Sequence, residues 1–370
     1  MLRCLAIYPH DINDNYINNI KNTLKLANKY NYQEIFTTIH LPEYSFENQI
    51  RCLKLLFNEM KHYSFDLTVD VGGEYFKYIL SDKTILNDIK IDYIRLDYGF
   101  DFKQVRDLYY LLKLKGFVLN ASIYNDKEFE NIINELNKID HNISIRACHN
   151  YYIKEESGID DIYAFKQDDY ISKYNIPIYY CIPTYSNPRG PLYKGLCTIE
   201  NHRFKSIIYI ISDLVLNHNS SAYMIADEWL SEDEFIEIEK IFKYLYMDLS
   251  KIEIIKIKFF NNISDDERRI VLKEHVFRND SPFNSLRSTS SREMAESGEL
   301  INKNNIFDIK PGYITINNKL LKRYSGELEV SMIDKKAKED TNVIARIVDK
   351  YDLIKLWRFK ENIKYRFVEE

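Results

Sequence analysis

The side chains of this sequence that are best suited to proton transfer stand singly at the ends of short apolar runs. Three of them are the carboxylates Asp70, Asp97 and Asp227. Hydrogen-bonding side chains end other runs: Tyr8, His40, Asn120 with Ser122, and His149 with Asn150. A carboxylic acid that gives up a proton and a carboxylate that accepts one are common partners in general acid–base catalysis, so this set predicts such chemistry.

A loop at residues 184–203 carries a second set of candidate residues, which are cationic. Its basic side chains are Arg189, Lys194, His202 and Arg203. We expect Thr198 to cap a following helix, with Glu200, His202 and Arg203 in the first turn. A helix N-terminus beside arginines favours a phosphate or carboxylate ligand. The alternative is a structured loop whose arginines pair with aspartates of the core.

A second basic run lies at residues 287–292, where Arg287 and Arg292 flank four hydroxyl side chains. Such a run could bind an anion, although a solvated loop is the simpler interpretation. We therefore rank Arg292 behind Arg189 as an anion contact.

Metal and cofactor motifs are absent from the sequence. No His-x-His pair follows the first apolar run, and no glycine-rich phosphate loop is present. The five cysteines are odd in number and form no Cys-x-x-Cys motif, so we expect reduced, buried thiols. The sequence thus predicts acid–base chemistry by carboxylates, with no metal and no cofactor.

Short apolar runs alternate with longer amphipathic segments through the first 250 residues. The runs expected to form strands are 3–8, 34–40, 67–71, 93–97, 117–120, 144–149, 177–182 and 222–227. Helix patterns between them include 15–30, 47–62, 103–114, 126–139 and 200–217. Eight repeated βα units predict a closed (β/α)8 TIM barrel. An open doubly wound sheet would need a glycine-rich turn after the first strand, and the sequence there is Tyr8-Pro9-His10-Asp11.

The C-terminal ends of the strands form the active-site face of TIM barrels, so the polar residues there are expected to converge at one rim. Alternation along the fourth strand puts Arg95 and Asp97 on the same face, where they should pair. Each of these residues could instead have a purely structural role. Asp97 could do no more than neutralise Arg95, Asp70 could cap a turn, and His149 and Asn150 could bond loop carbonyls.

The pattern changes near residue 250. Beyond a helix at 231–248, short strands are predicted at 252–259, 314–316, 327–332, 343–348 and 365–368. Turn signals such as Pro311-Gly312 and Asn317-Asn318 separate some of them. We therefore expect a TIM-barrel catalytic domain at residues 1–250 and a small β-barrel or sandwich at residues 251–370.

Charge and hydropathy limit the kinds of partner that this chain can bind. The chain has 370 residues and a formal net charge of -5, with acidic and basic residues interspersed. This argues against duplex nucleic acid as the main partner. The most apolar run, 207–216, is too short to cross a bilayer, and no signal-like segment precedes the first strand. We therefore expect a cytoplasmic protein without a membrane or nucleic-acid partner.

Several longer segments resemble the 6-phospho-N-acetylmuramidase family. In the first domain they are LAIYP (5–9), EIFTTIHLPE (34–43), IRLDYGF (94–100), LNAS (119–122), ACHNYY (147–152) and NPRGPLYKGLCTIENHR (187–203). In the second they are RSTSSR (287–292), RYSGELEV (323–330) and NVIARI (342–347). The resemblance spans nearly the whole chain. The sequence departs from the family pattern after Asp70, where Pro or Ser is expected and the chain has Val71-Gly72-Gly73.

The resemblance implies a TIM barrel followed by a cyclophilin-like domain. It also implies cytoplasmic hydrolysis of N-acetylmuramic acid 6-phosphate–N-acetylglucosamine to N-acetylmuramic acid 6-phosphate and N-acetylglucosamine in cell-wall recycling. Such a substrate presents a phosphate and a carboxylate, for which Arg189, His202 and Arg203 are the first candidates, with Lys194 and Arg292 behind them.

Glycoside hydrolysis needs a carboxylic acid and a second group that acts as base, nucleophile or stabiliser. We prefer Asp97 and Asp227, with Asp70 in reserve and Glu200 as a further carboxylate. Because Arg95 should keep Asp97 charged, Asp70 or Asp227 is the better acid. The substrate-binding set we expect is Tyr8, His40, Arg95, Asn120, His149, Asn150, Arg189, Glu200, His202, Arg203 and Arg292.

Two other functions are compatible with the same rim. A sugar-phosphate lyase or epimerase would usually use a Schiff-base lysine or a metal, and no lysine ends a predicted strand. A sugar-phosphate-binding protein without catalysis seldom needs several carboxylates in its site. The hydrolase is therefore preferred over both.

Overall fold

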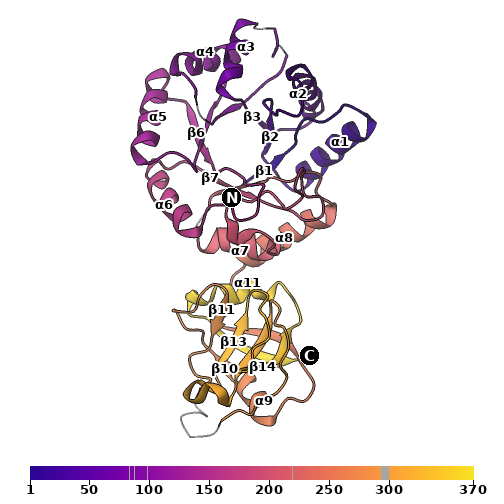
Figure 1. Cartoon of the computed structure of the whole chain (residues 1–370), viewed down its shortest axis with the longest axis vertical. Coiled ribbons are helices and arrows are strands. Elements are labelled where there is room, and N and C mark those ends of the chain that lie inside the picture. Colours follow the sequence, from indigo (N-terminus) through magenta and orange to yellow (C-terminus); the bar gives the residue numbers. More distant parts are fainter. Residues whose placement is uncertain (83, 87, 98, 219, 293–299) are drawn as a thin grey trace. The chain divides into compact units, whose positions relative to one another are not determined.

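The computed structural model describes residues 1–82, 84–86, 88–97, 99–218, 220–292 and 300–370. The described chain divides into two compact units. Residues 1–205 and 218–236 form the first, here called the barrel unit, and residues 206–217 and 237–370 form the second, the β unit (Figure 1). The domain boundary expected after residue 250 stays a prediction.

The barrel unit is built on eight parallel strands that close in sequence order, β1-β2-β3-β4-β5-β6-β7-β8, so the expected (β/α)8 fold is confirmed. The strands are β1 (Leu2–Ala6), β2 (Glu34–Thr38), β3 (Asp66–Asp70), β4 (Tyr93–Leu96), β5 (Gly116–Asn120), β6 (Ser144–Cys148), β7 (Ile178–Ile182) and β8 (Ala222–Ile225). Side chains of alternate residues fill the interior, as Cys4 and Ala6 do from β1 and Tyr179 and Cys181 from β7.

Helices α1 to α6 lie outside the strands (Figure 1). They are α1 (Asp14–Lys29), α2 (Phe46–Met60), α3 (Gly73–Ser81), α4 (Phe102–Leu112), α5 (Asp126–Ile139) and α6 (Asp161–Ile171). The α5 helix shows why these segments are helical. Asn125 and Glu128 form a capping box at its start, and Phe129, Ile132, Ile133 and Leu136 form one buried stripe. Two short 3-10 helices follow, η1 (Ser172–Tyr174) and η2 (Glu200–His202).

One expected helix begins later than predicted. The segment 200–217 contains η2 and then α7 (Ile207–Leu216), whose N-cap is Ser206. Thr198 is therefore not a helix cap; its hydroxyl donates to the Asn150 carbonyl at 2.9 Å and accepts the Cys181 N–H at 2.9 Å. The left-handed φ of 61° at Phe204 interrupts the helical path. Glu200, His202 and Arg203 consequently do not form the first turn of α7.

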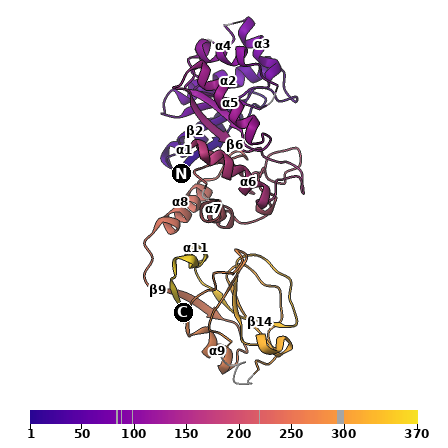
Figure 2. The ribbon, with the colours of Figure 1, turned by 90° about the vertical axis from the view of Figure 1, so that its left-hand side faces the viewer.

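The β unit is a curled seven-stranded sheet in the order β10-β15-β9-β14-β12-β13-β11 (Figure 2). Its strands are β9 (Ile252–Phe259), β10 (Glu274–His275), β11 (Ser285–Arg287), β12 (Tyr313–Asn317), β13 (Leu328–Ser331), β14 (Thr341–Ile347) and β15 (Lys364–Glu369). Its other elements are α8 (Glu232–Tyr246, begun in the barrel unit), α9 (Asp265–Val271), η3 (Lys319–Tyr324), α11 (Asp352–Trp357) and η4 (Phe359–Glu361). Burial alternates along β9, where Ile255 and Ile257 face the core, as expected for a strand with one solvated face.

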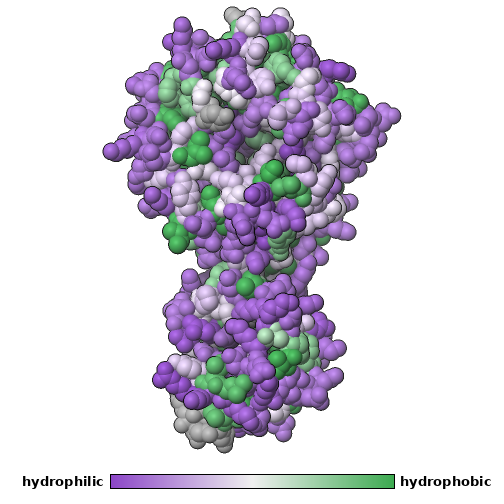
Figure 3. Space-filling view, in the orientation of Figure 1, coloured by the Kyte–Doolittle hydropathy of each residue, from purple (hydrophilic) through white to green (hydrophobic). Residues whose placement is uncertain are grey.

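The surface in Figure 3 is mainly hydrophilic, with apolar side chains in small separate groups. Within the described residues, no helix combines the length and the apolar character needed to cross a membrane.

Candidate active site

Two adjoining cavities lie at the C-terminal ends of strands in the barrel unit. The first has a volume of about 230 Å³ and is lined by Phe36, His40, Asp70, Arg95, Asp97, Cys148, His149, Asn150, Tyr151 and Met224. The second has a volume of about 330 Å³ and is lined by His40, Gly72, Gly73, Glu74, Asp97 and Gly99. Because His40 and Asp97 contribute to both walls, the cavities adjoin. The expected convergence of strand-end side chains therefore holds for Asp70, Asp97, His40, Arg95 and Asn150, whereas the His149 imidazole is fully buried.

Arg95 is the cation at the centre of the first cavity. Its Nη1 lies 3.5 Å from Asp70 Oδ1 and 3.3 Å from Asp97 Oδ1. Its Nη2 donates to Asn150 Oδ1 at 2.6 Å. The predicted pairing of Arg95 with Asp97 is therefore present. The same guanidinium also holds Asp70, which brings two carboxylates to one cation.

Two amide side chains complete this network. Asn120 Nδ2 donates to both Asp97 Oδ1 and Asn150 Oδ1. The orientation of Asn120 is fixed because its Oδ1 accepts the Ser122 N–H at 2.8 Å. Asp97 thus receives hydrogen bonds from a guanidinium and an amide, both of which stabilise a charged carboxylate.

Asp70 is held in a different electrostatic environment. Burial raises its pKa above the ordinary value, and the nearby Asp97 charge adds to this, whereas Arg95 and His40 oppose it. His40 Nε2 lies 3.7 Å from Asp70 Oδ2. A carboxyl group with a raised pKa beside one that accepts hydrogen bonds from a guanidinium and an amide is the arrangement expected of an acid and its partner.

Asp227 has other partners. Its side chain accepts backbone N–H groups from Thr184 at 2.9 Å, Arg189 at 2.8 Å and Leu196 at 3.2 Å. Burial raises its pKa, and these three hydrogen bonds oppose the rise. The residue is fully buried and does not line either cavity. Asp227 therefore anchors the 184–196 loop and is not brought together with Asp70 and Asp97.

Arg189 lies beside the first cavity. Its guanidinium lies 3.9 Å from the centre of the Tyr8 ring, and its Nε lies 3.9 Å from Glu228 Oε2. Tyr8 in turn packs edge-on against Tyr151, a residue of the cavity wall. Arg189 and Asp70 both influence the pKa of Tyr151, which burial raises above its usual value. The rings of Tyr8 and Tyr151 thus connect Arg189 to the wall of the carboxylate cavity.

The other charged residues of the predicted anion site hold the loop together. Arg203 forms an ion pair with Glu200 at 2.7 Å and donates to the carbonyls of Gly195 and Tyr152. Glu200 also accepts the N–H groups of Glu156 and Gly158. His202 is fully buried. The alternative of a structured loop therefore describes Glu200, His202 and Arg203 better than an anion site does.

Comparison with known families decides the classification. The N-terminal model of 6-phospho-N-acetylmuramidase matches residues 4–240, and the C-terminal model of the same family matches residues 254–368. The chain belongs to the 6-phospho-N-acetylmuramidase family. The resemblance noted in the sequence is thereby confirmed.

Solved structures agree on the fold of this 6-phospho-N-acetylmuramidase family member. A conserved protein of unknown function from Enterococcus faecalis matches with a TM-score of 0.58 at 23% identity, covering 100% of this chain and 97% of that one. An uncharacterised protein from B. cereus matches with a TM-score of 0.56 at 22% identity, covering 100% and 99%. No curated protein sequence matches the chain.

Another predicted anion contact, Arg292, belongs to the β unit of this family member. Arg292 lies 5.4 Å from the centre of the Tyr324 ring. The hydroxyls of the same run are used in the fold, since Ser288 bonds His275 and Ser291 accepts the Leu328 N–H. The solvated-loop alternative thus describes this run at least as well as an anion site.

Sequence reasoning missed Glu228 and Tyr151 in this family member. Glu228 is buried at the end of β8 and binds the Tyr8 N–H at 2.9 Å and His10 Nε2 at 2.9 Å. The sequence offered one clue to Glu228: it directly follows Asp227, so along an extended chain its side chain points to the opposite face. Tyr151 follows His149 and Asn150 directly, but nothing in its spacing showed that it would line the cavity.

Proposed function

We propose that this chain hydrolyses the glycosidic bond of N-acetylmuramic acid 6-phosphate–N-acetylglucosamine and releases the two sugars during peptidoglycan recycling in the cytoplasm. One observation carries this proposal: Asp70 and Asp97 lie on the same Arg95 nitrogen in one cavity, in a chain of the 6-phospho-N-acetylmuramidase family. Two carboxyl groups in one cavity are what hydrolysis of a glycosidic bond requires.

Asp70 is the proposed general acid. Its raised pKa keeps a proton available for the leaving oxygen, since burial disfavours its charged form. Asp97 is the proposed charged partner, which acts as base, nucleophile or stabiliser of the positive charge that develops on the sugar ring. This assignment replaces Asp227, whose oxygens accept three backbone N–H groups.

Arg189 is the proposed contact for one anion of the substrate. Its side chain is 15% exposed, and its ion-pair distance to Glu228 is long, at 3.9 Å. A phosphate could accept two parallel hydrogen bonds from the guanidinium, which a lysine cannot provide. Arg189→Lys should therefore raise KM for the phosphorylated disaccharide and change KM for the unphosphorylated one little. Equal effects on the two substrates would exclude Arg189 as the phosphate contact.

The direct test is to incubate the purified protein with the phosphorylated disaccharide and identify the products by mass spectrometry. We expect N-acetylmuramic acid 6-phosphate and N-acetylglucosamine, which together result from the addition of one water across the bond. Asp97→Asn serves as the inactive control. An intact disaccharide, or a product that lacks water as a lyase would give, would overturn the proposal.

A further inference from the structure

A chain of buried polar side chains runs outward from the carboxylate site through the barrel wall. His149 directs Nδ1 to Ser122 Oγ at 3.0 Å and Nε2 to Asp168 Oδ1 at 3.6 Å. Its imidazole is fully buried and packs on the Tyr180 ring at 4.5 Å. Tyr180 alternates with Tyr179 and Cys181, which fill the barrel interior, so it faces the helices. The imidazole therefore lies behind the wall, where it supports the site and does not contact substrate.

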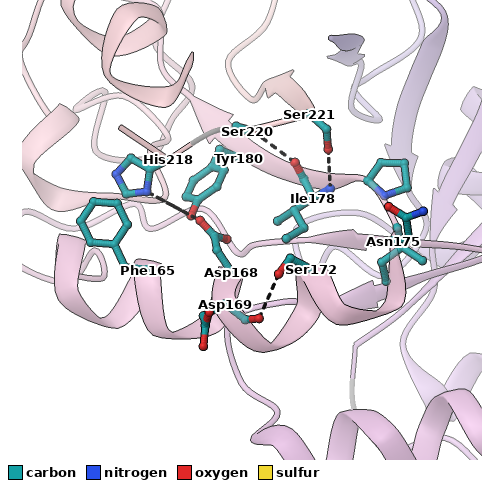
Figure 4. A pocket seen from close by; sticks show the side chains of 12 residues that line it. Phe165, Asp168, Asp169, Ser172, Asn175, Ile178, Tyr180, His218, Ser220 and Ser221 are labelled. Atoms are coloured by element: carbon teal, nitrogen blue, oxygen red, sulfur yellow. Dashed lines mark hydrogen bonds and ion pairs between the residues drawn. The ribbon is translucent and has the colours of Figure 1, made fainter. Parts of the chain in front are cut away.

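Asp168 ends this chain on α6. Its Oδ2 accepts the Tyr180 hydroxyl at 2.5 Å and lies 3.7 Å from His218 Nδ1 (Figure 4). Burial alone would raise the pKa of Asp168, but the nearby His149 and His218 rings and the hydrogen bond from Tyr180 lower it below the ordinary value. Asp168 is thus a carboxylate at neutral pH. Because the Asp168 carboxylate lies 3.6 Å from Nε2 and attracts an N–H group there, we assign the ring proton of His149 to Nε2.

The His149 tautomer determines which hydrogen bonds the Ser122 hydroxyl makes. With the proton on Nε2, His149 Nδ1 accepts the Ser122 hydroxyl, and a Ser122 lone pair accepts the Asn150 N–H at 2.9 Å. The Ser122 N–H holds Asn120 Oδ1 at 2.8 Å, which turns the Asn120 amide group towards Asp97 and Asn150. Ser122 therefore holds the Asn120 side-chain amide through its own backbone N–H and the backbone of Asn150 through its hydroxyl.

We propose that Asp168 is a positioning residue for the reaction: through His149 and Ser122 it places Asn120 and the backbone of Asn150, two residues whose side chains contact Asp97 and Arg95. The kinetic part of this inference rests on the proposed function. If the tautomer changes, Nδ1 becomes a donor and the Ser122 hydroxyl loses the acceptor of its proton. A shift of Ser122 to find another acceptor would displace Asn120 and the Asn150 backbone, which Ser122 holds. Small displacements of this kind in an active site can cost on the order of 10²-fold in rate.

A separate cavity gives direct access to Asp168. It has a volume of about 530 Å³, and its lining includes Asp168, Tyr180, His218, Asp169, Ser172 and Asn175 (Figure 4). A small carboxylate that enters this cavity could replace the side chain of a truncated Asp168. Formate is small enough to occupy the space left by the missing carboxyl group.

The test is chemical rescue of Asp168→Ala by formate. We expect this variant to lose on the order of 10²-fold in kcat with KM little changed, and added formate to restore kcat in a saturable way. Asp169→Ala is the matched control, since Asp169 is exposed, lies next to Asp168 and lines the same cavity. It should keep kcat and not respond to formate. Unchanged kcat in Asp168→Ala, or a loss that formate does not reverse in the folded variant, would overturn the proposal.

A second measurement tests the inference if Asp168→Ala does not fold. It needs no substrate, so it also separates this inference from the proposed function. Nitrogen NMR of histidine-labelled protein, assigned with His149→Gln, reports the His149 tautomer without any substrate. The wild type should carry the proton on Nε2, and Asp168→Asn, which keeps the shape of the side chain, should shift the ring towards Nδ1. The same tautomer in both proteins would refute the positioning role. A shifted tautomer in a protein that does not cleave the disaccharide would refute only the proposed function.

Discussion

At the scale of single residues, the site separates two aspartates by their surroundings. Both contact Arg95 Nη1, but Asp97 also accepts the Asn120 amide, whereas burial raises the pKa of Asp70. Two identical side chains can therefore take opposite roles in one reaction.

The role of Asp70 predicts a pH dependence. A general acid works while protonated, so kcat should fall as pH rises through the raised pKa of Asp70. Asp70→Asn should lower kcat by about 10²- to 10⁴-fold and remove this alkaline fall. Initial rates between pH 5 and 9 on both proteins provide the measurement. An alkaline limb that persists in Asp70→Asn would assign the acid to another residue.

Asp227 should behave as a structural residue. Asp227→Asn weakens the acceptor for three buried N–H groups, so we expect a loss of about 1–3 kcal/mol in the free energy of unfolding. Asp97→Asn, at a more exposed position, should cost less stability and more activity. Urea unfolding and kcat of both variants provide the comparison. The reverse ranking would return Asp227 to the catalytic set.

At the scale of elements, a buried ion cluster ties four strands of the barrel together. Arg146 on β6 pairs with Glu34 on β2 at 2.6 Å and with Asp66 on β3 at 2.8 Å. Tyr179 on β7 donates to Glu34 at 2.7 Å. Burial raises the pKa of Glu34, and Arg146 is the main opposing influence. The cluster is therefore stable only while its cation is present.

Removal of that cation should destabilise the barrel strongly. Arg146→Leu leaves Glu34 buried without its charged partner, which should cost about 3–5 kcal/mol in the free energy of unfolding. Arg106→Leu is the control, because Arg106 and Asp107 form an exposed pair worth at most about 1 kcal/mol. Denaturant titrations measure both. Similar small losses in the two variants would show that the cluster contributes little.

At the scale of the whole molecule, the chain contains two compact units, each with its own apolar core. The two tryptophans report on them separately, since Trp229 lies in the barrel unit and Trp357 in the β unit. Trp357 stacks on Phe283 at 4.9 Å and donates to the Phe283 carbonyl.

Unfolding should therefore depart from a single two-state transition. Trp229→Phe and Trp357→Phe each leave one fluorescent reporter, and their denaturation midpoints should differ. Circular dichroism of the same samples follows both units at once and should show a broader transition than either reporter. Coincident transitions by all three probes would show that the units unfold together.

The strand order could be predicted from the amino-acid pattern, because eight apolar runs separated by amphipathic helices have one closed parallel arrangement. The same pattern also determined the pairing of Arg95 with Asp97, since alternation along one strand needs no distant information. Several predicted strands were too long at their C-terminal ends, as at His40 and Asp227. Polar residues there continue the alternation but lie in the loops that form the site.

Only the tertiary structure decided which polar residues share a cavity. Asp227 and Asp70 both stand at strand ends, yet backbone N–H groups of a distant loop surround one and Arg95 binds the other. Asp168 lies 19 positions after His149 on a helix, and nothing in that spacing shows that the two side chains meet. Local patterns fix the elements, because periodicity is a property of neighbouring residues, whereas partners between elements depend on how the barrel closes.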